Sequence, residues 1–267
     1  MNLKGMIKKS LKRFAMKHLN ISAPYEFKTA KSIRDQIFHF ECGGKIFEIS
    51  ADYTTPLYET IAEIVDNDCY QLKSMEFIGA KEQIILDIGA NVGVSALVLS
   101  RIKNARIYCF EPLPENCARI EENVRKNSVN DVKIISKAVA KTDGKILLEM
   151  IPDQSVSARI PLGGQSTSAV KAVEVEAISM ATILDTLNIK TIDLIKIDCE
   201  GGEYDIIDQI DISLAQRIRY ISLEVHDISP NKNFRNLSKQ LQELGYRLKY
   251  NPEVFGRAGL NHLLAFR

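Results

Sequence analysis

The sequence has no long apolar run and no closely spaced cysteine pair. Its apolar runs all fall short of the roughly 20 residues that a membrane-spanning helix needs. The five cysteines are odd in number, widely spaced and form no C-x-x-C motif, which argues against a disulfide scaffold or a zinc module. The N-terminus also lacks an apolar segment followed by a small-residue cleavage site. We therefore expect a reduced, cytoplasmic protein without a signal peptide.

The chain also lacks a strong excess of either charge. Its net charge is +1, so the composition does not indicate a nucleic-acid partner. The exception is residues 1–20, which carry +6 and no acidic residue, whereas the remainder carries −5. Apolar residues recur at helical spacing in this segment, which predicts a basic amphipathic helix. The helix either docks on the rest of the protein or contacts a membrane surface or a polyanion.

The 267 residues are enough for one large α/β domain with an N-terminal addition. We divide the chain into a helix and cap region, residues 1–80, and a main domain, residues 81–267. Gly43-Gly44 between two apolar segments predicts a β-hairpin in the cap. A helix is expected over residues 56–67, with Pro56 in its first turn.

From residue 84 onward, strand-like and helix-like segments alternate, which predicts crossover connections and a doubly wound, mostly parallel sheet. A polar, Ser/Gly-rich stretch interrupts the alternation between two strand-like segments, and we interpret it as a β-hairpin insertion. The expected strands are 84–89, 106–111, 132–140, 193–198, 219–225, 246–251 and 261–267, the insertion strands 143–151 and 170–179, and the helices 95–103, 114–127, 180–189 and 234–245.

The segment "ILDIGANVGVSALVLS" joins a buried strand to a helix through a glycine-rich turn. Gly89 and Gly93 allow the backbone to approach a ligand closely. The spacing matches neither G-x-G-x-x-G nor a G-K-[ST] phosphate motif. Asp87 at the strand end suits a cationic ligand better than a pyrophosphate. Glu111, which ends the next strand, is placed to bind the two hydroxyls of a ribose.

Four segments together resemble the FkbM family of S-adenosylmethionine-dependent methyltransferases: "LDIGANVGVSAL", "FEPLPENCARIEENVRKN", "KAVAKTDGKILL" and "LIKIDCEGGEYDII". The resemblance covers about residues 80–267. It implies a Rossmann-like class I methyltransferase fold, with a seven-stranded sheet whose last strand is antiparallel.

The resemblance also implies roles for individual residues. Asp87, Gly89, Asn91 and Gly93 would hold the methionine part of S-adenosyl-L-methionine, Glu111 the ribose, and Ala138 would lie beside the adenine. Asn123 and Asn127 match family positions that we interpret as structural helix caps.

Polar side chains gather where two further strands end, and we expect them to converge at the carboxyl edge of the sheet. Asp198 and Glu200 follow one strand, and Glu224 and His226 follow the next. A carboxylate or a neutral imidazole there could take the proton of a hydroxyl acceptor. Asp198, Glu200 and His226 are therefore the predicted catalytic residues, and no resident metal is predicted.

Three alternatives remain open at this edge. Asp198 could bind the ammonium group of the cofactor, and His226 could be structural. The four groups could also hold a divalent ion. Glu203 is expected to face solvent on the helix that follows.

The leading functional hypothesis is O-methylation of a sugar, glycolipid or natural-product hydroxyl. An Asn/Asp-Pro-Pro-aromatic turn, common in enzymes that methylate amino groups, is replaced here by "DCEGGE". The alternatives are an RNA or protein methyltransferase that docks through residues 1–20, and an inactive cofactor-binding protein. The glycine turn together with Glu111 argues against the inactive protein.

Overall fold

The computed structural model describes residues 28–29, 35–52, 55–73, 75, 82–150, 158–159, 172–250 and 261–267. The predicted helix over residues 1–20 and most of the predicted tip of the hairpin insertion lie outside the described residues. Within these ranges, no helix has both the length and the apolar character needed to cross a bilayer.

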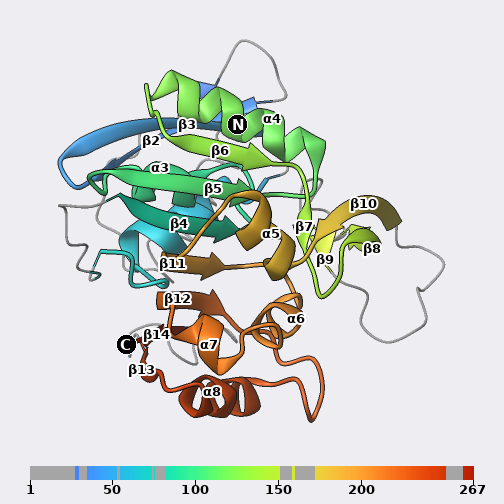
Figure 1. Cartoon of the computed structure of the whole chain (residues 1–267). Helices are drawn as coiled ribbons and strands as arrows, with labels where there is room; N and C mark the ends of the chain where they lie inside the picture. Colours follow the sequence, from blue (N-terminus) through green and yellow to red (C-terminus); the bar gives the residue numbers. More distant parts are fainter. Residues whose placement is uncertain are drawn as a thin grey trace.

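A seven-stranded sheet forms the centre of the molecule (Figure 1). The strand order is β13-β14-β12-β11-β4-β5-β6, and β14 runs antiparallel to both of its neighbours while the other pairs are parallel. This arrangement confirms the predicted fold class. The strands are β4 (Gln83–Ile88), β5 (Ala105–Phe110), β6 (Val132–Ile135), β11 (Ile192–Ile197), β12 (Ile218–Glu224), β13 (Arg247–Tyr250) and β14 (His262–Phe266).

Helices connect these strands, as the alternation of the sequence predicted. They are α3 (Val94–Leu99), α4 (Pro114–Lys126), α5 (Met180–Thr186), α6 (Glu203–Ile207), α7 (Ile212–Ala215) and α8 (Phe234–Glu243). Gly245 ends α8 in the left-handed region at φ 91°, and the backbone N–H of Tyr246 donates to the carbonyl of Leu241. This is the glycine-terminated helix end expected for residues 234–245.

The two faces of the sheet bury separate hydrophobic clusters. Along β4 the side chains alternate, so Ile85 faces one cluster while Leu86 and Ile88 face the other. The first cluster includes α3 and the N-terminal cap, and the second includes α5, α6 and α8. The cap therefore shares a hydrophobic core with the sheet.

A second, four-stranded sheet has the order β7-β10-β8-β9. It contains β7 (Ala138–Val139), β8 (Gly144–Met150), β9 (Ala158–Arg159) and β10 (Ala172–Ile178). Strands β8 and β10 pair antiparallel, which confirms the predicted hairpin insertion. The single strand expected over residues 132–140 is wrong: β6 pairs with β5 in the main sheet, whereas β7 pairs with β10 in this one.

The N-terminal cap contains β1 (Lys28–Thr29), β2 (Asp35–Cys42), β3 (Lys45–Asp52), α2 (Leu57–Ile61) and the π-helical turn η1 (Ala62–Asp66). Gly43 and Gly44 both have positive φ values, as the predicted β2–β3 hairpin requires. The helix expected over residues 56–67 begins after Pro56 but widens into η1 after its first turns.

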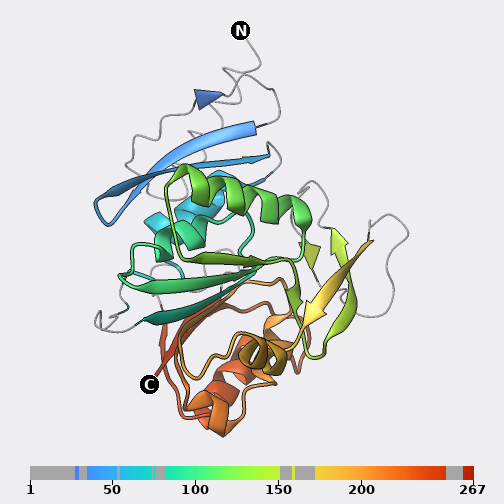
Figure 2. The same cartoon turned by 45° about the horizontal axis from the view of Figure 1, so that its top comes forward.

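Asn123 of α4 and Asn127, which caps its C-terminal end, attach this helix to β3, and Figure 2 shows the hairpin and α4 side by side. Asn123 accepts a hydrogen bond from the backbone N–H of Ser50 at 2.9 Å and donates to the carbonyls of Ser50 and Val92. Asn127, at the C-terminal end of α4, binds the backbone of Glu48. Both residues are structural, as expected, but Asn123 joins three segments rather than capping a helix.

Candidate functional site

The glycine-rich turn touches the end of the neighbouring strand so closely that only glycine fits at position 89. Gly89 has φ 74°, and a Cβ there would lie 1.7 Å from the backbone oxygen of Asp198. Asn91 also has a positive φ of 49°. Gly93 precedes α3 with φ 94°. At Gly89 the turn therefore places backbone rather than a side chain at the carboxyl ends of β4 and β11.

Glu111 lies at the end of β5, next to this turn, and is almost fully buried. Its carboxylate accepts hydrogen bonds from the backbone N–H groups of Asn91 and Leu113, both at 3.0 Å, and from the side-chain amide of Asn116. Burial raises the pKa of Glu111 to about 7, although these hydrogen bonds lower it. A buried carboxylate in this state gains from further donors, such as the hydroxyls of a ribose.

A pocket extends from Glu111 along the carboxyl ends of β4 and β11. Five of the predicted cofactor and catalytic residues line it together with Glu111, namely Gly89, Asn91, Ala138, Asp198 and Glu200. One wall is apolar, built by the second sheet: Ala138, Ile146 and Leu148. Ala138 lines the pocket, and its place beside the adenine stays a prediction.

Asp87 and Gly93 lie outside the lining of this pocket. Asp87 is fully buried, and Ser95 donates a hydrogen bond to it at 2.6 Å. The structure therefore places Asp87 behind the glycine turn, where it supports the turn. Its predicted contact with the methionine part would have to be indirect.

Lys196 is the residue that connects Asp87 to the pocket. It lies on β11, only 1 % exposed, and its Nζ is 3.2 Å from Asp198 Oδ2 and 3.6 Å from Asp87 Oδ1. Nζ also donates to the carbonyl of Gly89 at 3.1 Å. Burial disfavours the charge on Lys196, but Asp198 and Asp87 outweigh burial and raise its pKa.

Asp198 stays ionised because of these contacts. Burial acts to raise its pKa, but Lys196 and hydrogen bonds from Tyr70 and Lys196 hold the pKa below its usual value. An ionised carboxylate beside the glycine turn suits a cationic group such as an ammonium. A lowered pKa makes Asp198 a weak proton acceptor.

Glu203 is completely buried, and the expectation that it faces solvent is wrong. Its carboxylate accepts hydrogen bonds from the backbone N–H groups of Gly201 at 2.9 Å and His226 at 2.8 Å. The same carboxylate lies 3.2 Å from the ring Nδ1 of His226. A neutral His226 that donates from Nδ1 to Glu203 leaves Nε2 as a free base.

Glu200 links this histidine to the pocket. Its carboxylate lies 3.4 Å from His226 Nε2, and its backbone adopts φ 48°. A left-handed conformation is uncommon for a glutamate and occurs preferentially at functional sites. The convergence of Glu200, Glu224 and His226 predicted from the strand ends is therefore present, with Glu224 Oε1 3.8 Å from His226 Nε2.

Several carboxylates at this edge repel one another. Burial and then the charge of Asp198 raise the pKa of Glu224 to about 9 and that of Glu63 to about 7. Burial opposes the charge on His226, but the hydrogen bond to Glu203 and the charges of Glu224, Glu203 and Glu200 raise its pKa to about 9. The carboxyl edge of the main sheet therefore favours cations and bound protons.

Four residues of the site were absent from the sequence-based prediction: Glu63, Tyr70, Lys196 and His262. A signal existed only for Lys196, a charged residue inside the apolar strand "DLIKID". The Tyr70 hydroxyl donates to Glu224, and the ring of Tyr70 meets that of His262 edge-on. These contacts join residues more than 150 positions apart and leave no local pattern.

Several curated proteins similar to this chain are named methyltransferases. Residues 87–248 match the family described as "Methyltransferase FkbM domain". "Methyltransferase 1" of Beauveria bassiana is 23% identical over 183 residues, covering 62% of this chain and 72% of that protein. The "31-O-demethyl-FK506 methyltransferase FkbM" of Streptomyces tacrolimicus is 23% identical over 213 residues, covering 70% of this chain and 80% of that protein. Among solved structures, the T. Thermophilus 16S rRNA N2 G1207 methyltransferase (RsmC) superposes with a TM-score of 0.49 at 10% identity, covering 97% of this chain and 62% of that one.

The buried charge of Lys196 generates a testable prediction for stability. Lys196→Met removes the cation and leaves the buried Asp87 and the partly exposed Asp198 without their partner, which costs about 3–5 kcal/mol in the free energy of unfolding. Denaturant unfolding of the purified proteins measures this loss. The matched control is Lys145→Met, which breaks an ion pair with Glu174 on the exposed side of the second sheet and should leave the unfolding midpoint unchanged. Equal midpoints for the two variants would contradict the role given to Lys196.

Proposed function

The chain belongs to the FkbM family of methyltransferases, and we propose that it methylates a hydroxyl oxygen of a sugar, glycolipid or natural product. As a member of this family it depends on S-adenosylmethionine. One relative is named as a methyltransferase of a 31-O-demethyl compound, which supports oxygen as the methylated atom. The observation that carries the proposal is the hydrogen-bonded pair of the buried Glu203 and the partly exposed His226, with His226 Nε2 3.4 Å from Glu200 at the pocket.

The residues of the pocket fit the cofactor. Glu111 would hold the ribose hydroxyls, the apolar wall at Ala138 would hold the adenine, and Asp198 with the backbone of Gly89 and Asn91 would hold the amino-acid end. When bound, the sulfonium supplies an activated methyl group, so the chain has to align the acceptor and remove its proton.

His226 would be the proton acceptor in this proposal. Its Nε2 takes the hydroxyl proton as the new bond to oxygen forms, and Glu203 orients the ring and stabilises the resulting imidazolium. Glu200 and Glu224 add negative charge beside Nε2, which increases its basicity. Asp198 would then serve the cofactor rather than the acceptor.

The cofactor site is tested at Glu111. Glu111→Ala removes the acceptor for the ribose hydroxyls and should weaken binding of S-adenosylhomocysteine by about 1.5–3 kcal/mol, measured by calorimetry. Because the Glu111 pKa is about 7, wild-type affinity should also fall as the pH drops below 7 and the carboxylate is protonated. Glu111→Gln should remove this pH dependence.

An affinity of Glu111→Ala equal to that of the wild type would contradict the ribose assignment. Glu115→Ala is a suitable control because Glu115 is exposed on the first turn of the same helix, α4, that follows Glu111. It should bind the ligand as the wild type does.

The acceptor class is tested with a labelled methyl donor and cell-extract fractions that separate lipid, glycan, RNA and protein. The proposal predicts labelled methyl ethers in the lipid or glycan fraction. Label found in RNA or protein alone would contradict it. With the labelled acceptor in hand, single-turnover rates should rise with pH and reach half their maximum near pH 9, because only neutral His226 accepts a proton.

Two substitutions identify the base in that assay. His226→Ala should slow transfer by about 10²–10⁴ while donor affinity is retained. Glu203→Gln removes a charge that raises the His226 pKa, so the pH profile should move to lower pH. The control His39→Ala, on strand β2, should change neither the transfer rate nor its pH profile. If the single-turnover rate of His226→Ala kept the wild-type dependence on pH, the base would be another group.

A further inference from the structure

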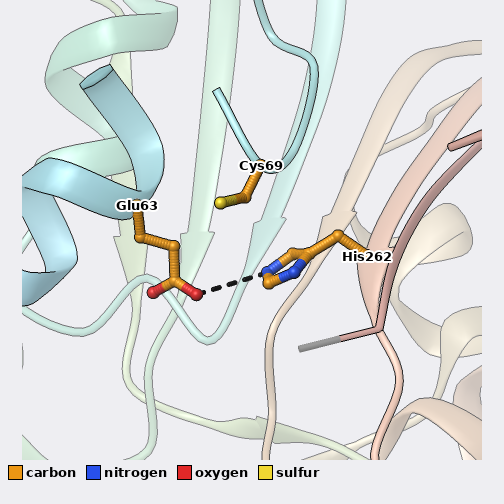
Figure 3. Close-up of side chains that lie close together, drawn as sticks. All are labelled: Glu63, Cys69 and His262. Atoms are coloured by element: carbon orange, nitrogen blue, oxygen red, sulfur yellow. Dashed lines mark ion pairs between the residues drawn. The ribbon is translucent and has the colours of Figure 1, made fainter. Parts of the chain in front are cut away.

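Three side chains from separate parts of the chain meet beside the catalytic edge. Glu63 lies on η1, Cys69 in the following turn, and His262 at the start of β14. Their carboxylate, sulfur and imidazole atoms all lie within 4.8 Å of one another. Figure 3 shows the three groups directed toward a common space, with Glu63 Oε1 3.4 Å from His262 Nε2.

His262 is the unexplained member of this group. Its side chain is only 2 % exposed, and neither ring nitrogen has a hydrogen-bond partner within the described part of the chain. An unsatisfied buried polar group typically lowers the free energy of unfolding by about 1–3 kcal/mol. A ligand that binds His262 would remove this penalty. A neutral imidazole nitrogen is a common metal ligand.

We infer that Glu63, Cys69 and His262 bind a zinc ion, with Glu224 as the fourth ligand. Imidazole nitrogen, thiolate sulfur and carboxylate oxygen are the ligand types of tetrahedral zinc sites, whereas calcium and magnesium prefer oxygen alone. Tetrahedral ligands about 2.0–2.1 Å from zinc lie roughly 3.3 Å apart, close to the Glu63–His262 distance. Glu224 Oε2 lies 3.8 Å from the same His262 nitrogen.

The surrounding charges favour a cation at this position. Glu63 Oε1 and Glu224 Oε2 lie 3.4 Å and 3.8 Å from the same nitrogen of His262, so two carboxylates would balance the charge of a divalent ion there. Cys69 is a free, buried thiol that can supply a thiolate once the metal displaces its proton. The ion would join the N-terminal cap to β14. The ligands are spread over 200 positions, which explains why cysteine spacing alone indicated no zinc module.

The full-length wild-type protein, freed of metal, is titrated with Zn²⁺ and separately with Co²⁺, without donor or acceptor. We expect one equivalent of zinc to bind and the cobalt form to show a thiolate-to-metal charge-transfer band. Cys69→Ser should lose the band. Cys69→Ser and His262→Gln should each bind zinc more weakly than the wild type. Loss of an outer-shell partner weakens metal binding by roughly 10–100-fold, so the loss of a direct ligand should cost at least that much. The control Cys42→Ser changes a buried free cysteine of β2 and should keep both signals.

A wild-type protein that binds no stoichiometric zinc, or a cobalt band that persists in Cys69→Ser, would overturn the inference. X-ray absorption at the zinc edge of the wild-type protein gives a second result that does not depend on the folding of any variant. One sulfur and one imidazole among four ligands supports the site, and a shell without sulfur overturns it. Because these measurements require no methyl transfer, they are independent of the proposed reaction.

Discussion

The site depends on the contacts that the buried ammonium group of Lys196 makes. It pairs with Asp198 on its own strand and with Asp87 on β4, and it donates to the carbonyl of Gly89 in the turn between β4 and α3. Two carboxylates in a buried position would otherwise repel each other, so the cation permits both strand ends to come together. The close approach of Gly89 to the backbone of Asp198 follows from this arrangement and leaves backbone groups free to line the pocket.

The N-terminal cap completes the site as well as the fold. Its residues share one hydrophobic cluster with β4 and α3, and Asn123 attaches β3 to the glycine turn through Ser50 and Val92. From the same region Tyr70 reaches the carboxylates at the ends of β11 and β12. A family match that begins at residue 87 leaves this cap outside, although the cap supplies groups at the carboxyl edge of the sheet.

The sequence predicted the features that depend on short-range patterns. The glycine turn, Glu111 and the alternation of strands and helices follow from spacing and apolar patterns. The seven-stranded sheet with an antiparallel last strand followed from the family resemblance. Glu203 was misplaced because the first turn of a short helix usually faces solvent. In the structure, the backbone N–H groups of Gly201 and His226 require an acceptor there. Lys196 had a local signal as a charged residue inside an apolar strand, but its contact with Asp87 and the contacts of His262 lie across strands and leave no local pattern.

A crystal structure of the complex with S-adenosylhomocysteine tests the central claim most directly, because that claim concerns where the cofactor lies. We expect the ribose hydroxyls within hydrogen-bonding distance of Glu111, the adenine against Ala138, the amino group near Asp198 and the sulfur on the side of Glu200 and His226. A ligand bound elsewhere, or in this pocket with its ribose turned away from Glu111, would contradict the account.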